Sequence, residues 1–378
     1  MENLHTFADS RRLHREIPPP SCILFSSLHP LAYDDASRLQ IPKLKGHRMN
    51  SKRVIVLGIT VSFLILASFV PAPAAAKCDR QCLVNLMQQY VAAMVKHDPK
   101  AAPLAANVKF MENAAVMPIG KGLWETASGG PTAFQIYAAD PVAQSVACLV
   151  VMKEQDKDIL LGASLKVVDG KITEAEQLVA RGNVNGSLPT LQKPRPGLVE
   201  DVAAADRMDR GELIKIGLSY YDALTGEDGT YAPFAADCER HENGAVAASS
   251  KPPESQAPKP DAKPNPELEK MMKAMAAIPR TCEGQISAGV FAYITDINPR
   301  RLVVADVQKG LAVGMSMFQH DGHLKTLPIK GVPGMDSMPG FTMQFNFPSI
   351  HFYKIKGGKI YDIETIGVSV PFGTKFGW

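Results

Sequence analysis

Residues 86–114, LMQQYVAAMVKHDPKAAPLAANVKFMENA, align without a gap on residues 216–244, IGLSYYDALTGEDGTYAPFAADCERHENG. The offset between the two stretches is constant at 130 (220 − 90). Identical residues occur along the whole alignment: Tyr90/Tyr220, Ala93/Ala223, Asp98/Asp228, Pro103/Pro233, Ala105-Ala106/Ala235-Ala236, Glu112/Glu242 and Asn113/Asn243. The sequence therefore predicts two diverged tandem copies of one domain.

A second repeated block lies near the end of each copy, where residues 166–176 align on residues 354–364 at an offset of 188 (354 − 166). Each block contains a turn, Asp169-Gly170 or Gly357-Gly358, between alternating strand residues, which indicates a β-hairpin. Because the offset rises from 130 to 188, the second copy carries 58 additional residues (188 − 130). We assign them mainly to a proline-rich insertion at 245–265 and a glycine- and methionine-rich loop at 330–343.

Each copy begins with a predicted helix, 81–95 or 210–224, whose apolar residues recur at helical spacing. Asp98 and Asp228 follow these helices, and each can cap a second, short helix. Strand-like segments fill the rest of a copy; in the first they are 108–112, 133–138, 145–153, 159–168 and 172–179. We therefore expect an α+β fold with two domains, 77–190 and 205–378, each a curved antiparallel sheet packed on N-terminal helices.

Residues 49–76 have the order of a secretory signal: Lys52-Arg53, an apolar run over 54–70, and small residues ending in Ala74-Ala75-Ala76. We predict cleavage before Lys77 and a periplasmic or secreted protein with no stable membrane insertion after cleavage. The apolar run is at the short limit for a membrane span, so an uncleaved anchor remains the alternative. Residues 1–48 are interpreted as an over-called start or a disordered extension.

The composition, with 46% hydrophobic and 21% charged residues, is that of an ordinary globular protein. A formal net charge of +3, without a Lys/Arg cluster beyond the flank of the signal, gives no electrostatic reason to expect a nucleic-acid partner.

Five cysteines follow the signal, and disulfides are expected after export. Cys238–Cys282 is the first choice, since it closes a loop of 45 residues (282 − 238 + 1) around the proline-rich insertion. Cys78 and Cys82 lie one helical turn apart, so a pair there requires a non-helical first turn. The pairing of Cys78, Cys82 and Cys148 is left open.

The start of the first copy, with QYVAAM at 89–94, Asp98, LAANV at 104–108, Glu112 and Gly120, resembles the NTF2-like superfamily. This cone-shaped α+β superfamily includes nuclear transport factor 2, ketosteroid isomerase and the SnoaL-like polyketide cyclases. The resemblance covers each repeat, and its short motifs are specific for the fold more than for a function. It implies a deep apolar pocket between sheet and helices. Because isolated cones pair sheet to sheet, it also implies an internal pseudo-dimer that is a monomer in solution.

In the isomerase-like members, a tyrosine of the first helix faces a carboxylate base of the first strand. The resemblance places Tyr90 and Tyr220 at the tyrosine position and Glu112 and Glu242 at the base position, as Glu where the isomerase has Asp. An apolar pocket strengthens the hydrogen bond of a tyrosine to a developing enolate, and a partly desolvated carboxylate can remove the α-proton.

A late strand of the isomerase supplies a further acidic donor. Aligning back from the hairpin places Ala163 there in the first copy and His351 in the second. We therefore predict catalytic roles for Tyr220, Glu242 and His351, with His241 beside them. Substrate binding is assigned to His241, Tyr90 and Glu112.

Structural explanations stand beside these roles. A tyrosine at an apolar helix position can simply be core, a Glu-Asn pair can end a strand, and His351 can be a hydrogen-bonded strand histidine. His320 and His323 flank an Asp-Gly turn without a third ligand at a recognisable spacing, so we expect no metal. No cofactor-binding motif is recognised either.

Two functions remain open from the sequence. One is a cofactor-independent lyase or isomerase that removes a proton next to a carbonyl of a small apolar or aromatic molecule. The other is a non-catalytic module that binds a hydrophobic ligand or another protein.

Overall fold

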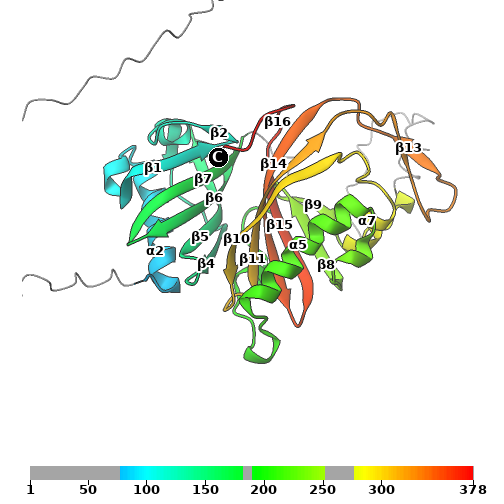
Figure 1. Cartoon of the computed structure of the whole chain (residues 1–378), viewed down its shortest axis with the longest axis horizontal. Helices are drawn as coiled ribbons and strands as arrows, with labels where there is room; N and C mark the ends of the chain where they lie inside the picture. The colour runs from blue at the N-terminus through cyan, green and yellow to red at the C-terminus, as the bar shows by residue number, and fades with distance from the viewer. Residues whose placement is uncertain (1–76, 182–189, 252–275, 378) are drawn as a thin grey trace, which may run out of the picture. The chain divides into compact units, whose positions relative to one another are not determined.

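The computed structural model describes residues 77–181, 190–251 and 276–377 (Figure 1). The expected signal at 49–76, the segment 1–48 and residues 252–265 of the proline-rich insertion lie outside the described residues. Within the described part of the chain, no helix is long and apolar enough to cross a membrane.

The first repeat (residues 77–181) contains one long helix and one large sheet. Its elements are α2 (Arg80–Val95), η1 (Pro99–Ala101), β1 (Leu104–Glu112), β2 (Ala115–Val116), α3 (Leu123–Thr126), β3 (Ala127–Gly129), β4 (Gln135–Asp140), β5 (Ser145–Glu154), β6 (Lys157–Val168) and β7 (Lys171–Ala180).

The second repeat (residues 210–377) follows a connection that contains α4 (Pro196–Val199) and η2 (Ala204–Asp206). Its elements are α5 (Arg210–Gly226), η3 (Gly229–Tyr231), β8 (Phe234–Glu242), β9 (Ala245–Ala248), α7 (Cys282–Ser287), β10 (Asp296–Asp306), β11 (Leu311–His320), β12 (Thr326–Pro328), β13 (Ser337–Pro339), β14 (Phe345–Lys356), β15 (Lys359–Gly367) and β16 (Val370–Pro371).

Local sequence explains the element boundaries. The Asp79 side chain caps α2, and Asp209 forms a capping box with Glu212 at the start of α5. Asp98 and Asp228 cap η1 and η3, as predicted. Both predicted hairpin turns have positive φ at their two central residues, which is the conformation that Asp-Gly and Gly-Gly favour.

The two sheets have equivalent topologies. The first has the order β2-β1-β7-β6-β5-β3 with β4 also on β5, and the second has the order β10-β11-β14-β15-β8-β9 with β16 on β14. In each sheet the first long strand pairs in parallel with the last, β1 with β7 and β8 with β15, whereas the other pairs are antiparallel. The expectation of a purely antiparallel sheet is therefore wrong in one strand pair of each repeat.

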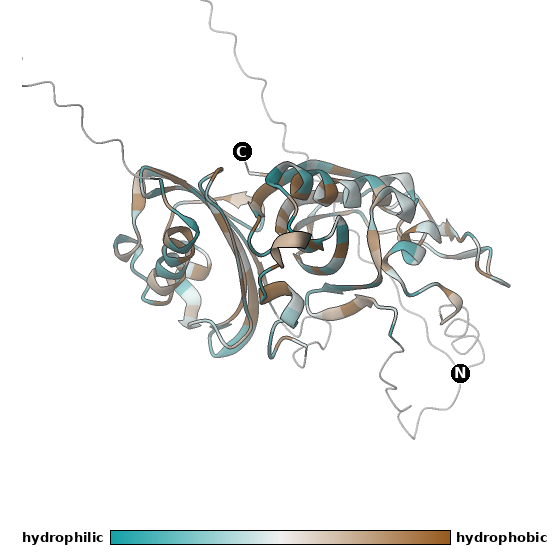
Figure 2. Cartoon of the chain, turned by 90° about the horizontal axis from the view of Figure 1, so that it is seen from below, coloured by the Kyte–Doolittle hydropathy of each residue, from teal (hydrophilic) through white to brown (hydrophobic). Residues whose placement is uncertain are grey.

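Each sheet curls around a helix and encloses an apolar core. Figure 1 shows α2 beside the first sheet, and Figure 2 shows that sheet edge-on, curved around the helix. The buried face of α2 includes Leu83, Met87 and Tyr90, and that of α5 includes Leu213 and Tyr220. The cone predicted from the sequence is therefore the observed fold of each repeat.

Both repeats belong to one compact unit, Pro71–Trp378, and a shared apolar cluster includes Leu149, Leu160, Ile350 and Phe352. Charged residues at the two helix starts also connect the repeats. Arg80 of α2 donates to Asp306 at 2.9 Å, and Arg210 of α5 donates to Asp140 at 2.8 Å. Asp140 and Asp306 end β4 and β10, and each is 1% exposed.

The predicted disulfide Cys238–Cys282 is present and joins β8 to α7. A second disulfide joins Cys78 to Cys82. It is possible because α2 begins at Arg80, so Cys78 precedes the helix and is free of its geometry. Cys148 is buried and unpaired.

Candidate functional site

A cavity of about 230 Å³ opens in the second repeat between α5 and the concave face of the sheet. Its wall is mainly aromatic, with a few polar side chains among the rings. The lining residues are Tyr220, Leu224, Arg240, Glu242, Phe291, Tyr293, Ile294, Phe318, His320, Phe341, Phe345, Phe347, Ser349, His351 and Ser369.

Tyr220, Glu242 and His351 all line this cavity. The strand register explains why two of them share a face: Thr365 of β15 is opposite both Glu242 of β8 and His351 of β14. In the first repeat Gln177 is opposite both Glu112 and Ala163 in the same way. The predicted equivalence of His351 with Ala163 therefore agrees with the register, and the catalytic roles stay predictions.

Tyr220 contacts a buried arginine at the cavity wall. Nη1 of Arg240 donates to the Tyr220 hydroxyl oxygen at 3.1 Å, and Nη2 donates to Oε1 of Gln285 at 3.1 Å. No acceptor for the Tyr220 hydroxyl proton is found among the described residues, so this O–H is available to a ligand. A guanidinium on the oxygen polarises the phenol and makes it a stronger donor.

Two histidines of the cavity are held neutral. Burial lowers the pKa of His351 to about 3, helped by the charge of Arg240, and burial lowers the pKa of His320 to about 4. His351 stacks on Tyr353 at a centroid distance of 5.7 Å, and His320 stacks on Phe345 at 4.0 Å. Nδ1 of each histidine is buried and has no hydrogen-bond partner among the described residues. Both rings are therefore uncharged at neutral pH.

The same positions in the first repeat form a closed network. The Tyr90 hydroxyl donates to Oε1 of Gln177 at 2.8 Å, and Nε2 of Gln177 donates to Oε2 of Glu112 at 3.0 Å. Glu112 also accepts from the Leu123 backbone N–H at 2.9 Å and from Nη2 of Arg181 at 3.0 Å. Tyr90 and Glu112, expected to bind substrate, are thus occupied by partners within the protein.

Two shorter side chains distinguish the second repeat. Thr365 stands where the first repeat has Gln177, and Ser369 stands where it has Arg181, both at the offset of 188. Thr365 is too short to bridge Tyr220 and Glu242 as Gln177 bridges their equivalents, and its buried Oγ1 has no hydrogen-bond partner in the described part of the chain. Ser369 lines the cavity that an arginine would fill.

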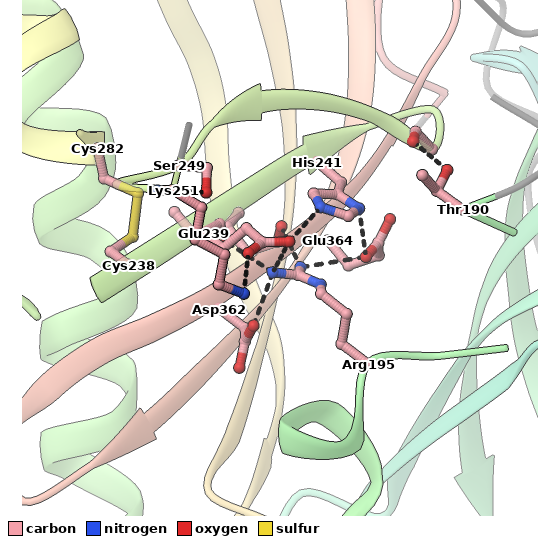
Figure 3. Close-up of polar contacts among 12 residues, drawn as sticks. Thr190, Arg195, Cys238, Glu239, His241, Ser249, Lys251, Cys282, Asp362 and Glu364 are labelled. Carbon is pink, nitrogen blue, oxygen red and sulfur yellow. Dashed lines mark hydrogen bonds and ion pairs between the residues drawn. A yellow bond between two sulfur atoms is a disulfide. The ribbon is translucent and has the colours of Figure 1, made fainter. Parts of the chain in front are cut away.

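His241 does not line the cavity, which differs from its predicted place beside Glu242. Adjacent residues of a strand point to opposite faces, so Arg240 and Glu242 face the cavity while His241 faces away. Figure 3 shows His241 in a charged cluster with Arg195, Glu239 and Glu364. Nε2 of His241 lies 2.7 Å from Oε1 of Glu239, and burial together with the charge of Arg195 lowers the His241 pKa to about 4.

Arg195 is the centre of that cluster. It donates to Oδ1 of Asp362 at 2.6 Å and to Oε2 of Glu364 at 3.1 Å, as well as to the carbonyl oxygens of Glu239 and Ile363. These contacts fix the connection between the repeats to the outer face of β8 and β15 (Figure 3). Two buried atoms of the cluster, Nε of Arg195 and Oε1 of Glu364, have no hydrogen-bond partner among the described residues.

Sequence reasoning missed Arg240 and the role of His320. Arg240 lies two residues before Glu242 on the same strand, so the period of two would have placed it on the same face. His320 was interpreted as part of a turn, but it is the last residue of β11 and lines the cavity. No signal in the sequence predicts that Phe341, from the loop assigned as an insertion, reaches the same cavity.

The site combines a carboxylate, a phenol with a cationic neighbour and neutral imidazoles within an aromatic wall. Such a set can bind a planar molecule, remove a proton and stabilise an oxyanion. Among the described residues, no group of three or more His, Cys, Asp and Glu side chains could hold a metal ion.

Comparison with known proteins gives one family match. Residues 206–367 match the family model DUF8021, a domain of unknown function, which covers most of the second repeat. No curated protein matches the chain.

Several solved structures are similar to part of the chain. A candidate polyketide cyclase from Silicibacter sp. TM1040 has 10% identity and a TM-score of 0.24, covering 43% of this chain and 92% of its own. AclR, a candidate hydroxylase from Streptomyces galilaeus, has 15% identity and a TM-score of 0.23, covering 31% and 89%. A candidate ketosteroid isomerase from Kribbella flavida has 18% identity and a TM-score of 0.23, covering 34% and 96%.

Neither the family model nor these structures assigns a substrate or an activity to this chain. By its own element order and strand pairing, each repeat is a curved sheet around an N-terminal helix, the cone architecture that the sequence predicts.

Proposed function

We propose that the second repeat binds a small aromatic molecule that carries a carbonyl group and removes a proton from the carbon beside it. The observation that carries the proposal is the meeting of Glu242 with the Tyr220–Arg240 pair at one aromatic cavity. No cofactor is needed for this reaction, because the carbonyl itself accepts the electron pair.

In the proposed reaction, a Glu242 oxygen takes the α-proton. The C–H electron pair then forms a carbon–carbon double bond, and negative charge develops on the carbonyl oxygen. Tyr220 donates its O–H to that oxygen, and the Arg240 contact strengthens this donor. Return of the proton from Glu242 to a different carbon gives an isomerase, and loss of a leaving group from the enolate gives a lyase.

His351 supports the same step as a neutral donor. With its pKa at about 3, the ring carries one N–H at neutral pH and adds no positive charge beside Arg240. A second hydrogen bond to the oxyanion can therefore form without charge repulsion between His351 and Arg240.

Deuterium exchange tests the proposal without knowledge of the natural substrate. The protein is incubated in D₂O with 2-indanone, a compact ketone whose α-carbons are attached to a benzene ring, and loss of the α-proton signal is followed by NMR. We expect exchange above the buffer rate, with Glu242→Gln slower by about 10²- to 10⁴-fold, the usual contribution of a positioned base. Tyr220→Phe is expected to slow exchange by about 10²-fold, the loss of one oxyanion donor.

Glu112→Gln is the matched control, since it makes the same change at the equivalent position of the first repeat. Its exchange rate should equal that of the unmodified protein. If 2-indanone binds and Glu242→Gln leaves exchange unchanged, the cavity is a non-catalytic binding site, which is the alternative function.

We further propose that the two repeats form an internal pseudo-dimer. Support comes from the reciprocal pairs Arg80–Asp306 and Arg210–Asp140, in which equivalent helix starts contact equivalent strand ends, as in a two-fold interface. The chain would then be a monomer in solution. Export to the periplasm or beyond is also proposed, supported by two disulfides, which persist in oxidising compartments.

A further inference from the structure

Arg240 is a buried cation without an anionic partner in contact. The residue is 8% exposed, and its two hydrogen bonds go to neutral oxygens of Tyr220 and Gln285. Its Nε is buried with no hydrogen-bond partner among the described residues. Among the described residues, no ion pair within 4.0 Å includes Arg240.

Burying an unpaired charge is costly, and the fold itself does not require one here. At the equivalent position of the first repeat, 130 residues earlier, stands Phe110, which is 1% exposed in an apolar core. The guanidinium carbon of Arg240 lies 4.7 Å from the centroid of the Phe291 ring, a contact that offsets part of the cost. The charge of Glu242 acts on Arg240 from beyond contact distance and helps to raise the pKa of Arg240. A ligand anion would add the contacting, hydrogen-bonded partner that the described residues do not supply.

The surroundings of Arg240 fit a flat anion. Phe291, Phe318 and Phe347 contribute rings to the cavity wall, which suits an aromatic body. The cavity has a volume of about 230 Å³ and an open mouth, so it can take a small aromatic ligand. One aromatic ring with a carboxylate is close to this size.

Glu242 limits where the negative group can lie. It stands two residues after Arg240 on the same face of β8 and lines the same cavity, so a ligand anion placed against it would be repelled. The favourable orientation puts the anion at the Arg240 end and the rest of the ligand toward Glu242.

We propose that this cavity selects aromatic carboxylates, with the carboxylate paired to Arg240. The proposal names the substrate class for the proposed function and rests on it for the reaction, but the selectivity is a property of binding alone. A ligand carboxylate would accept from the guanidinium as a contacting counter-charge and leave the reactive carbon near Glu242.

Binding of matched probes tests the proposal on the full mature chain. Benzoate and benzamide have nearly the same shape and differ in charge, and calorimetry at pH 7 measures the affinity of each. We expect benzoate to bind at least 10-fold more tightly than benzamide to the unmodified protein. Equal affinities for benzoate and benzamide would overturn the proposal. So would the absence of detectable benzoate binding at a ligand concentration of about 10 mM, which corresponds to a very weak affinity.

Arg240→Met keeps an unbranched side chain and removes the guanidinium group with its charge. We expect it to weaken benzoate binding by about 10- to 100-fold, the usual range for a charged hydrogen bond, while benzamide binding changes little. Arg300→Met is the control, because Arg300 pairs with Asp222 and does not line the cavity. Equal weakening of benzoate and benzamide by Arg240→Met would mean that the arginine acts only in packing. The comparison on the unmodified protein decides the question even if Arg240→Met fails to fold.

Glu242→Gln separates the two proposals. It removes a negative charge from the cavity, so benzoate should bind at least as tightly as before, whereas the proposed exchange reaction should be lost. Loss of exchange without benzoate selectivity contradicts the carboxylate proposal and leaves the proposed function standing. Selective binding of benzoate without exchange contradicts the proposed function and leaves the carboxylate proposal standing.

Discussion

The interiors of the two repeats differ more than their folds. In the first repeat, Gln177 connects Tyr90 to Glu112, and the polar groups at the centre of the cone satisfy one another. In the second, the equivalent Tyr220 and Glu242 face a cavity. The backbone frame is shared, since the equivalent strands pair in equivalent register. A pocket in this fold therefore depends on a few side-chain lengths at the centre of the sheet.

The two interiors also differ in histidine content, and this difference predicts how they respond to acid. His241, His320 and His351 are buried in the second repeat, with pKa values lowered to about 4, 4 and 3 by burial. The described part of the first repeat has His97, which is exposed. Folding thus disfavours protonation of three histidines in one repeat.

We expect the second repeat to lose stability first as the pH falls. A histidine with a lowered folded-state pKa stabilises the fold above its unfolded pKa of about 6.5, and this contribution declines as the pH drops toward the folded value. Between pH 6.5 and 5 each such histidine costs about 1.5 kcal/mol, or about 5 kcal/mol for the three. Protonation of Glu364, whose pKa burial raises to about 7, offsets part of this loss. Hydrogen exchange should show the loss of protection in β14 before β6.

Replacing one of these histidines by glutamine provides the control. His320→Gln should remove about one third of the histidine contribution to the pH dependence, since each histidine contributes a similar share over this range. Equal loss of protection in both repeats between pH 6.5 and 5 would show that the buried histidines do not set the response.

The same substitution at the two glutamates should have unequal effects on stability. Glu112→Gln removes the charge of a carboxylate that accepts three hydrogen bonds. We expect this substitution to lower the free energy of unfolding by about 2 kcal/mol. Glu242→Gln should change it by less than about 0.5 kcal/mol, because this glutamate has no such partners among the described residues. Urea unfolding of both variants makes the measurement, and comparable losses would mean that Glu242 is also a structural residue.

Transferring the first repeat's side chains into the second should close the pocket. In a Thr365→Gln and Ser369→Arg double variant, the glutamine can bridge Tyr220 and Glu242, and the arginine can pair with Glu242. We expect benzoate affinity to fall about 10-fold, equivalent to about 1.4 kcal/mol. Gln177→Asn in the first repeat, far from the cavity, is the comparison for non-specific effects. Unchanged benzoate binding in the double variant would place the ligand elsewhere.

Much of the architecture could be predicted because it depends on local chemistry. The repeat, the Asp caps, the Gly-containing hairpin turns and the loop closed by Cys238–Cys282 all follow from short stretches of sequence. Strand period and hairpin register also brought Glu242 and His351 to one face. The same two-residue period along β8 would also have placed Arg240 on the cavity face with Glu242, and His241 on the opposite face.

Whether the Tyr–Glu pair lies in a filled core or beside a cavity was decided by tertiary structure. That outcome depends on Gln177 of β7 and Thr365 of β15, strands that are distant in sequence from the helix and the glutamate of their repeat. It also depends on Phe341, which comes from a long loop. His241 contacts Glu239 and Glu364, which both pair with Arg195, and this cluster likewise requires the connection between the repeats to lie on β8 and β15. The sequence by itself determined which residues share a helix or strand face, because backbone geometry repeats every few residues. Packing between distant segments determined which of those residues remain open to a ligand.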